Sequence, residues 1–177
     1  MSRTSKLIIG SALALVALAA VLLAPIDFGA TRIVSEADIA RPPGDVYAYV
    51  TTPSHWPDWH PSSLGVHGAM DHSLLVGETV EEDFSVAGHT GRVTWRVTDR
   101  EPDRYWRIAG TIGGREAGTV SYTLTARAEG THFMRVFEYG APNLLFALLN
   151  RWTIRQQIDE ESRTAVRQLK QRLEGSI

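Results

Sequence analysis

The sequence contains no cysteine, which excludes disulfides, thiolate nucleophiles and metal sites built from thiolates. It also lacks an excess of basic residues, because 18 lysines and arginines stand against 20 aspartates and glutamates. Binding to nucleic acid normally requires a basic stripe, so we expect no nucleic-acid partner. The six histidines form neither an HExxH nor an HxH arrangement with a nearby carboxylate. We therefore expect neither a metal ion nor another cofactor.

Charged residues are absent from a long apolar run near the N-terminus, Leu7 to Ala24. At about 1.5 Å of rise per residue, a helix of this run is roughly 27 Å long. Pro25 and Ile26 bring it close to the thickness of a bilayer core, about 30 Å. The pattern predicts an N-terminal transmembrane helix over residues 7–26, through which the chain contacts a membrane.

The charges around this run predict its orientation. Arg3 and Lys6 precede it, so the positive-inside rule places residues 1–6 in the cytoplasm. Residues 27–30 then form a linker, and the rest of the chain forms an extracytoplasmic domain anchored to the membrane. The alternative is a signal peptide with a small-x-small site at residues 17–19, whose cleavage releases a secreted domain.

The remainder of the chain shows patterns typical of one α+β domain over residues 31–174. Period-two alternation over residues 31–40 predicts a first strand, and Pro43 suits the first turn of a short helix. A segment rich in tryptophan, proline and histidine follows this helix over residues 53–61. Residues 76–139 then alternate between apolar and polar side chains, with glycine and proline at intervals. This pattern predicts a series of antiparallel strands.

No glycine or proline occurs between Pro142 and Gly175, and apolar residues in this stretch recur at helical spacing. The pattern predicts one long amphipathic helix that closes the domain. An antiparallel sheet that is apolar on one face must cover that face, and this helix is the only predicted element long enough to do so. We therefore predict a curved antiparallel sheet wrapped around a long C-terminal helix, with one or two short helices after the first strand.

Several segments in this order resemble the START-like helix-grip superfamily (SRPBCC), and in particular its polyketide cyclase/dehydrase-like branch. These segments are Pro43–Thr51, Trp56-Pro57-Asp58-Trp59, Val76-Gly77-Glu78 and Phe137-Glu138-Tyr139, within a resemblance that extends from about Ile33 to Leu173. The resemblance implies a deep, mostly apolar cavity between helix and sheet, used across the superfamily for lipids, steroids and polyketides. Some members are cyclases, hydrolases or dehydratases, and many only bind or carry a ligand, so the fold alone does not define the function.

The tryptophan segment is the first candidate for a site. Large aromatic side chains often line cavities, so we interpret Trp56 and Trp59 as cavity walls or a gate, with a stacked structural pair as the alternative. His55 and His60 lie beside them in the sequence. Because histidine titrates near neutrality, both are candidates for acid/base groups at the opening, and ordinary surface histidines are the alternative.

Glu82 is the second candidate. Strand alternation places it on the core-facing side, where an unpaired carboxylate is costly. Either of the two alternating sets of side chains in residues 131–139 can face the core. If the aromatic side faces inward, Arg135 is the partner of Glu82; if the other side does, Glu138 forms a carboxylate pair with it. A β-bulge that turns Glu82 outward is a further alternative.

The predicted fold and its candidate residues support three hypotheses for function. The first is membrane-tethered binding of a hydrophobic or amphipathic small molecule, lipid-, steroid- or polyketide-like, without catalysis. The second is an enzyme of cyclase, dehydratase or hydrolase type. The third is a structural or partner-binding module whose cavity is filled by its own side chains.

The catalytic candidates are Glu82, Glu138, His60 and Tyr122. The residues expected to contact a ligand are Trp56, Trp59, His60, Glu82, Phe84, Trp95, Tyr122, Arg135, Leu149 and Trp152.

Overall fold

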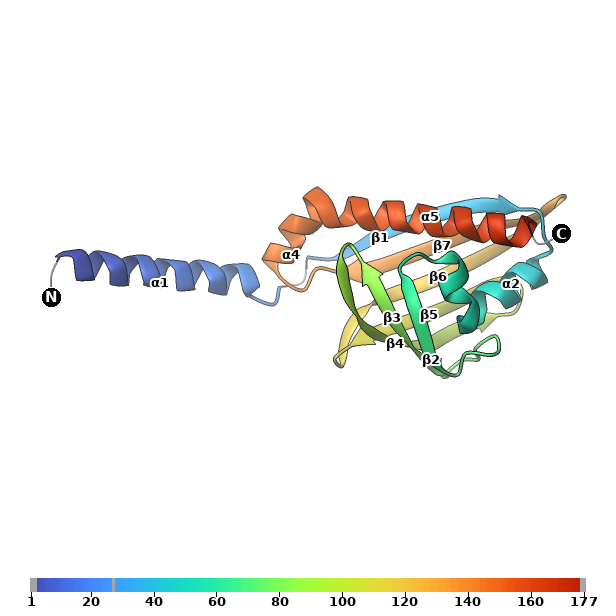
Figure 1. Ribbon diagram of the computed structural model, residues 1–177, viewed down its shortest axis with the longest axis horizontal. Helices are drawn as coiled ribbons and strands as arrows, with labels where there is room; N and C mark the ends of the chain where they lie inside the picture. The colour runs from blue at the N-terminus through green and yellow to red at the C-terminus, as the bar shows by residue number, and fades with distance from the viewer. Residues whose placement is uncertain (1–2, 27, 176–177) are drawn as a thin grey trace.

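The computed structural model describes residues 3–26 and 28–175, of which residues 3–8 and 10 are described by their backbone alone. Within these residues a seven-stranded antiparallel sheet curves around a long C-terminal helix (Figure 1). The strand order across the sheet is β1-β7-β6-β5-β4-β3-β2. The strands are β1 (Ala30–Ile39), β2 (Ser63–Gly68), β3 (Thr79–Val86), β4 (His89–Glu101), β5 (Tyr105–Ile112), β6 (Arg115–Arg127) and β7 (Gly130–Gly140). The predicted α+β helix-grip architecture is confirmed.

The helices are α1 (Arg3–Leu23), α2 (Pro43–Thr51), η1 (Pro53–His55), α3 (Trp56–Trp59), α4 (Leu144–Leu149), η2 (Asn150–Ile154) and α5 (Arg155–Glu174). Helix α5 lies along the concave face of the sheet, whereas α1 projects away from it (Figure 1). Helix α2 starts at Pro43, because proline suits the first turn of a helix. Helix α5 buries Ile158, Val166 and Leu169 against the sheet. The two short helices predicted after the first strand are therefore present as α2 and the η1–α3 segment.

The C-terminal helix differs from the prediction of one regular element. The chain is helical from Leu144 to Glu174, but Asn150–Ile154 forms a π-helical turn. The buried side chain of Asn150 accepts a hydrogen bond from the Tyr139 hydroxyl (2.7 Å) and donates one to Thr31 Oγ1 (2.8 Å). A π turn places one more residue in the turn than an α-helix does. Apolar positions before the turn therefore face a different direction from those after it.

Strand β3 begins at Thr79, later than the alternation of the sequence predicts. Val76 is 59% exposed and lies outside the sheet, because Gly77 takes a positive φ of 91° and turns the chain before Thr79. The β-bulge considered for β3 is instead a register shift in its neighbour β2, between Ser63 and Gly65. Consequently β3 keeps its alternation through Glu82.

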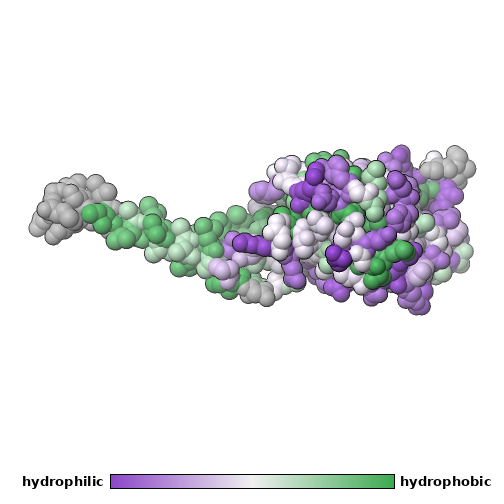
Figure 2. Space-filling view, turned by 90° about the horizontal axis from the view of Figure 1, so that it is seen from below, coloured by the Kyte–Doolittle hydropathy of each residue, from purple (hydrophilic) through white to green (hydrophobic). Residues whose placement is uncertain are grey.

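The apolar N-terminal run lies largely in α1, which projects from the domain beside α4 (Figure 1). Figure 2 shows its hydrophobic surface, and Leu13, Leu15 and Val16 are each about two thirds exposed. None of the helices in the described part of the chain has the length and apolar character needed to cross a membrane. The side chains of residues 1–8, which include the predicted cytoplasmic segment, and residue 27 of the predicted linker lie outside the described residues.

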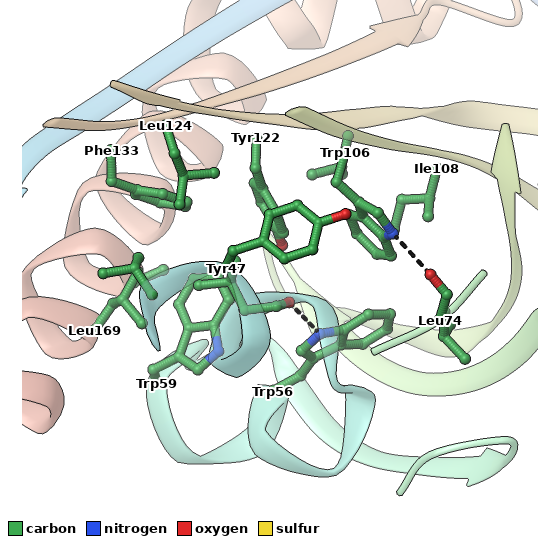
Figure 3. Close-up of a cluster of buried hydrophobic side chains, with 14 of the residues drawn as sticks. Tyr47, Trp56, Trp59, Leu74, Trp106, Ile108, Tyr122, Leu124, Phe133 and Leu169 are labelled. Atoms are coloured by element: carbon green, nitrogen blue, oxygen red, sulfur yellow. Dashed lines mark hydrogen bonds between the residues drawn. The ribbon is translucent and has the colours of Figure 1, made fainter. Parts of the chain in front are cut away.

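One end of the space between helix and sheet is filled by aromatic side chains (Figure 3). Trp106 is fully buried, stacks on Tyr122 at 5.4 Å between ring centroids, and meets Trp56 edge-on at 6.2 Å. The indole of Trp56 donates to the Val50 carbonyl (2.9 Å), and that of Trp106 donates to the Leu74 carbonyl (3.4 Å). This end is a packed core, so any ligand must occupy the other end.

Candidate functional site

A cavity of about 680 Å³ lies between the sheet and the first half of α5. Its walls are mainly apolar and come from the inner faces of β3 to β7 and from α5. The apolar wall includes Phe84, Val93, Trp95, Ile108, Val120 and Phe137. Sites for small organic ligands typically measure about 300–1,000 Å³ and are lined in this way. The cavity therefore has the size and lining of a small-molecule site.

The cavity opens at the end of the domain where α1 and α4 meet it. Pro25, Ile26 and His89 line this end and are exposed. Phe146 of α4 and Ile154 of η2 also line the cavity there. A molecule entering the cavity would therefore pass residues that follow the apolar helix α1.

Most of the predicted ligand contacts lie in the cavity wall. The lining residues among them are Trp56, Trp59, His60, Glu82, Phe84, Trp95, Tyr122 and Arg135. Trp56 and Trp59 are buried (4% and 0% exposed), so they form part of an inner wall rather than a movable gate at the surface. Their contact with a ligand remains a prediction.

Leu149 and Trp152 do not line the cavity, so the structure places them outside the wall in which their contact with a ligand was expected. Leu149 is 48% exposed and Trp152 is 71% exposed. The physical reason is the π turn of η2, which rotates these positions away from the face that α5 buries. Both residues instead contribute to an apolar surface on α4 and η2.

Glu82 points into the cavity as the alternation of β3 predicts. The indole Nε1 of Trp95 donates to Glu82 Oε2 at 2.7 Å. Removal from water raises the pKa of the Glu82 carboxyl, and its hydrogen bonds and the charge of Arg135 only partly oppose this. Glu82 is therefore protonated over a wider pH range than an ordinary glutamate.

On β7 the side chain of Arg135 faces inward and is 6% exposed. Its Nη1 donates to Ser162 Oγ (2.7 Å), and the same oxygen accepts a bond from Ser35 Oγ (3.0 Å). Among the described residues no ion pair joins Arg135 to Glu82, although both line the cavity. Burial lowers the pKa of the Arg135 guanidinium.

Glu138 lies on the opposite side of β7, where its carboxylate pairs with the exposed Arg32 (3.4 Å). It does not line the cavity, so the carboxylate pair with Glu82 does not form. Glu138 is thus a poor candidate for catalysis in the cavity. The reason is the strand pleat: Arg135 and Glu138 are three residues apart and must face opposite sides of the sheet.

Tyr122 and His60 complete the polar side of the cavity. Burial raises the pKa of Tyr122 to about 12, so its phenol is neutral. Burial and the nearby charge of Arg135 hold the pKa of His60 well below its ordinary value, so its imidazole is neutral as well. His55, in contrast, stacks on Tyr49 at 4.3 Å and does not line the cavity.

Two polar residues of α5 that sequence reasoning did not single out contribute to the site. Ser162 holds Arg135, and it is the one small polar residue among the buried positions of α5 in the described chain. Glu161 accepts bonds from Ser62 Oγ and from the Ala87 backbone, each at 3.0 Å, and so links α5 to the segments beside β2 and β3. The sequence signal for Ser162 is a serine within the apolar stripe of a helix, which predicts a buried polar contact.

The described residues contain no cluster of three or more histidine, aspartate or glutamate side chains placed to hold a metal ion. The polar groups of the cavity are instead single donors and acceptors distributed along an apolar wall. Such an arrangement can orient an organic molecule, and Glu82, His60 and Tyr122 are the groups in it that can exchange protons.

Comparison with known proteins shows the family to which the chain belongs. A family model described as "Polyketide cyclase / dehydrase and lipid transport" matches residues 30–174. A curated relative, Penitrem biosynthesis cluster 1 protein I of Penicillium ochrochloron, is 32% identical over 76 residues, which are 42% of this chain and 50% of that protein. The match therefore spans about half the length of the relative.

Solved structures share the fold at low sequence identity. Protein MLL2253 from Mesorhizobium loti is 19% identical with a TM-score of 0.59, over 83% of this chain and 99% of that one. A protein from Rhodobacter sphaeroides is 20% identical with a TM-score of 0.61, over 83% of this chain and 94% of that one. At these identities the likeness shows the fold alone.

Proposed function

The chain belongs to the polyketide cyclase/dehydrase and lipid transport family, and from this membership we propose that it binds a hydrophobic or amphipathic small molecule in the cavity between its sheet and α5. The observation that carries the proposal is the cavity itself, about 680 Å³ with a mainly apolar wall. Its size argues against the third hypothesis, in which the protein's own side chains fill this space.

Native mass spectrometry of the purified protein tests this proposal. We expect a bound molecule of a few hundred daltons that survives gentle ionisation and is lost on unfolding. A cavity-filling variant, Ala117→Phe, should release it, because Ala117 lines the cavity. Thr119→Phe is the matched control on the same strand, since Thr119 does not line the cavity. Preparations that are ligand-free and identical for wild type and Ala117→Phe would contradict the proposal.

An enzymatic role is the second candidate, and one observation favours it. Glu82, with a raised pKa, shares the cavity with the neutral imidazole of His60 and the hydroxyl of Tyr122. Such groups suit proton transfer in a cyclase, dehydratase or hydrolase. The discriminating measurement is the mass of the bound molecule before and after prolonged incubation with wild type and with Glu82→Gln. A mass change that requires Glu82 would favour catalysis over binding.

We further propose that α1 attaches the protein to a membrane, with the domain on the extracytoplasmic side. The support is the exposed apolar surface of α1 and its position beside the opening of the cavity (Figure 2). In cell fractionation, the full chain should remain in the membrane pellet after carbonate extraction. N-terminal sequencing separates this proposal from the secreted alternative, because a cleaved signal peptide would leave a soluble chain that lacks residues 1–19 or more.

A further inference from the structure

The inner end of the cavity contains polar atoms that the protein leaves without partners. Within the described residues, Nε1 of Trp59, both ring nitrogens of His60 and Nε of Arg135 are removed from solvent and make no hydrogen bond. All three residues line the cavity. Buried polar atoms normally find partners, because an unmade hydrogen bond costs the full loss of hydration. Several unpaired atoms in the lining of one cavity therefore indicate a ligand group that completes them.

The unpaired atoms specify the chemistry of that group. The indole N–H of Trp59 and the Nε–H of Arg135 are donors only, so both require an acceptor. The neutral imidazole of His60 offers one donor and one acceptor nitrogen and adapts to either partner. A ligand oxygen that accepts hydrogen bonds satisfies this set, whereas an apolar group leaves it unpaired.

The charge of Arg135 narrows the acceptor to an anion. Its Nη1 donates to the neutral hydroxyl of Ser162, and in the described part of the chain no carboxylate lies within ion-pair distance of it. A buried cation gains most from an opposite charge that is hydrogen-bonded to it. A carboxylate matches the planar guanidinium, because two parallel N–H···O bonds can form, and it is the smallest organic anion that does so.

Glu82 does not supply this anion. Its carboxyl is held by Trp95 on β4, and burial favours its protonated form. Arg135 therefore lies in the cavity wall with no carboxylate of the described residues within ion-pair distance. Much of the remaining wall is apolar, with Phe84, Val93 and Phe137 among its residues.

We propose, on the basis of the ligand-binding function proposed above, that the inner end of the cavity recognises the carboxylate of an amphipathic acid, with Arg135 and Trp59 as its hydrogen-bond donors. The apolar body of the acid lies along the aromatic and aliphatic wall and points toward the opening. Ser162 acts as a positioning residue, because its hydroxyl orients the guanidinium.

The test uses two probes with the same apolar body, dansyl-undecanoic acid and its methyl ester, titrated by fluorescence into the full chain at neutral pH. We expect the acid to bind about tenfold more tightly than the ester. In Arg135→Met the preference should fall to about one, while the affinity for the ester changes by less than about twofold. Trp59→Phe keeps an aromatic ring, although a smaller one, and removes the indole N–H, and it should reduce the preference about threefold.

Arg107→Met is the matched control, because Arg107 is an exposed arginine on β5 that does not line the cavity, and it should keep the full preference. Circular dichroism verifies the fold of each variant. If Arg135→Met does not fold, Arg135→Lys replaces it: lysine keeps the charge without the planar fork, and a preference of about threefold is expected.

The outcomes separate this inference from the proposed function. Equal binding of acid and ester to the wild type would overturn carboxylate recognition and leave the apolar cavity as a binding site. An acid preference that persists unchanged in folded Arg135→Met would overturn the assignment to Arg135. Failure of both probes to bind, together with a ligand-free native mass spectrum, would overturn the proposed function as well.

Discussion

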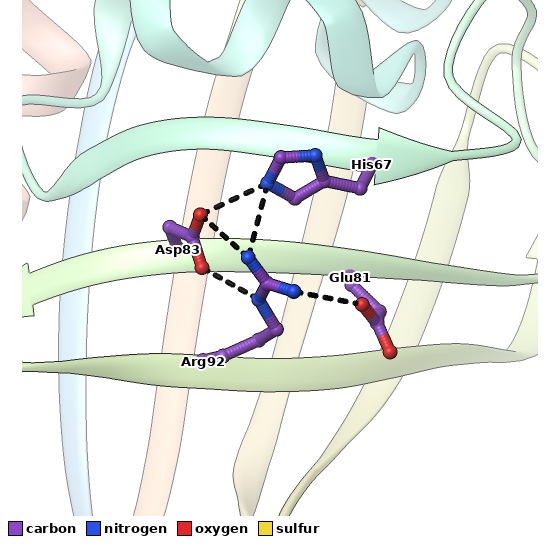
Figure 4. Close-up of polar contacts among 4 residues, drawn as sticks. All are labelled: His67, Glu81, Asp83 and Arg92. Atoms are coloured by element: carbon purple, nitrogen blue, oxygen red, sulfur yellow. Dashed lines mark hydrogen bonds and ion pairs between the residues drawn. The ribbon is translucent and has the colours of Figure 1, made fainter.

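Glu82 and Asp83 are neighbours on β3 and have opposite surroundings. Asp83 faces away from the helix, where Arg92 of β4 donates to it at 2.7 Å and His67 of β2 lies 2.9 Å away (Figure 4). These partners hold the pKa of the Asp83 carboxyl well below its ordinary range, whereas burial raises the pKa of Glu82. The outer face pairs its charges with neighbouring strands, and the inner face leaves its polar groups in an apolar wall.

The charged groups on the outer face of the sheet are paired within the protein, whereas the polar groups on its inner face are available for function. Outer-face charges are exposed to solvent and meet their partners within the protein, so they require nothing else. Polar groups on the inner face cost free energy on folding, and they suit contact with a ligand or a role in a reaction. The three predictions below compare inner and outer residues of the same sheet, in order of decreasing effect on stability.

The largest effect is expected for Trp106→Ala on β5. Trp106 is fully buried between Trp56 and Tyr122, so truncation removes a large apolar surface and leaves a cavity in the packed end. We expect a loss of about 3–5 kcal/mol in the free energy of unfolding. Arg107→Ala, one position along on the outer face, should change it by less than about 0.5 kcal/mol. Urea denaturation monitored by circular dichroism measures both, and a similar loss in the two variants would contradict the assignment of faces.

A smaller effect is expected for Gly110→Ala, also on the inner face of β5. An added Cβ would lie 2.6 Å from Cζ3 of Trp95, so the indole that holds Glu82 must move. We expect a loss of about 1–3 kcal/mol, the usual cost of overpacking, and a shift in tryptophan fluorescence. Gly65→Ala on β2 is the control, because its Cβ would have no atom within 4 Å. An unchanged fluorescence spectrum in Gly110→Ala would contradict the close approach of Gly110 to the Trp95 indole.

The smallest effects concern the pH dependence of stability, and they have opposite signs for Glu82 and Asp83. Because the pKa of Glu82 is raised in the folded protein, the unfolded chain ionises first, and wild-type stability falls as pH rises above the ordinary glutamate pKa of about 4.3. Glu82→Gln removes this penalty. The stability of this variant relative to wild type should therefore increase between pH about 4 and about 7.

For Asp83 the folded pKa is depressed, so its stabilisation is present above the ordinary aspartate pKa and is lost as pH falls toward the folded value. Asp83→Asn should therefore be less stable than wild type at neutral pH, and the difference should shrink on acidification. Thermal unfolding of both variants across this pH range gives the comparison. Parallel pH profiles for the two variants would contradict the opposite environments of the two carboxyl groups.

Much of the fold was predictable because its signals are local. The alternation of β4 and β6 and the absence of glycine and proline from 143 to 174 are consequences of strand and helix geometry that any segment shows by itself. The inward position of Glu82 followed from the same alternation, and it is correct because β3 contains no bulge. The beginning of β3 and the faces of Leu149 and Trp152 were missed, since a positive φ at Gly77 and a π turn at Asn150 depend on contacts with distant residues.

The sequence by itself determined the element order, the α+β class and the set of polar residues available to an apolar cavity. Only the tertiary structure decided which of those residues meet. The parity of β7 is set by its pairing with β1 and β6, which turns Arg135 inward and Glu138 outward. Packing of α5 on the sheet then places Ser162 on the guanidinium and leaves the remaining donors without partners. Alternation along a strand is a local property, whereas the face that becomes buried depends on what the rest of the chain packs against it.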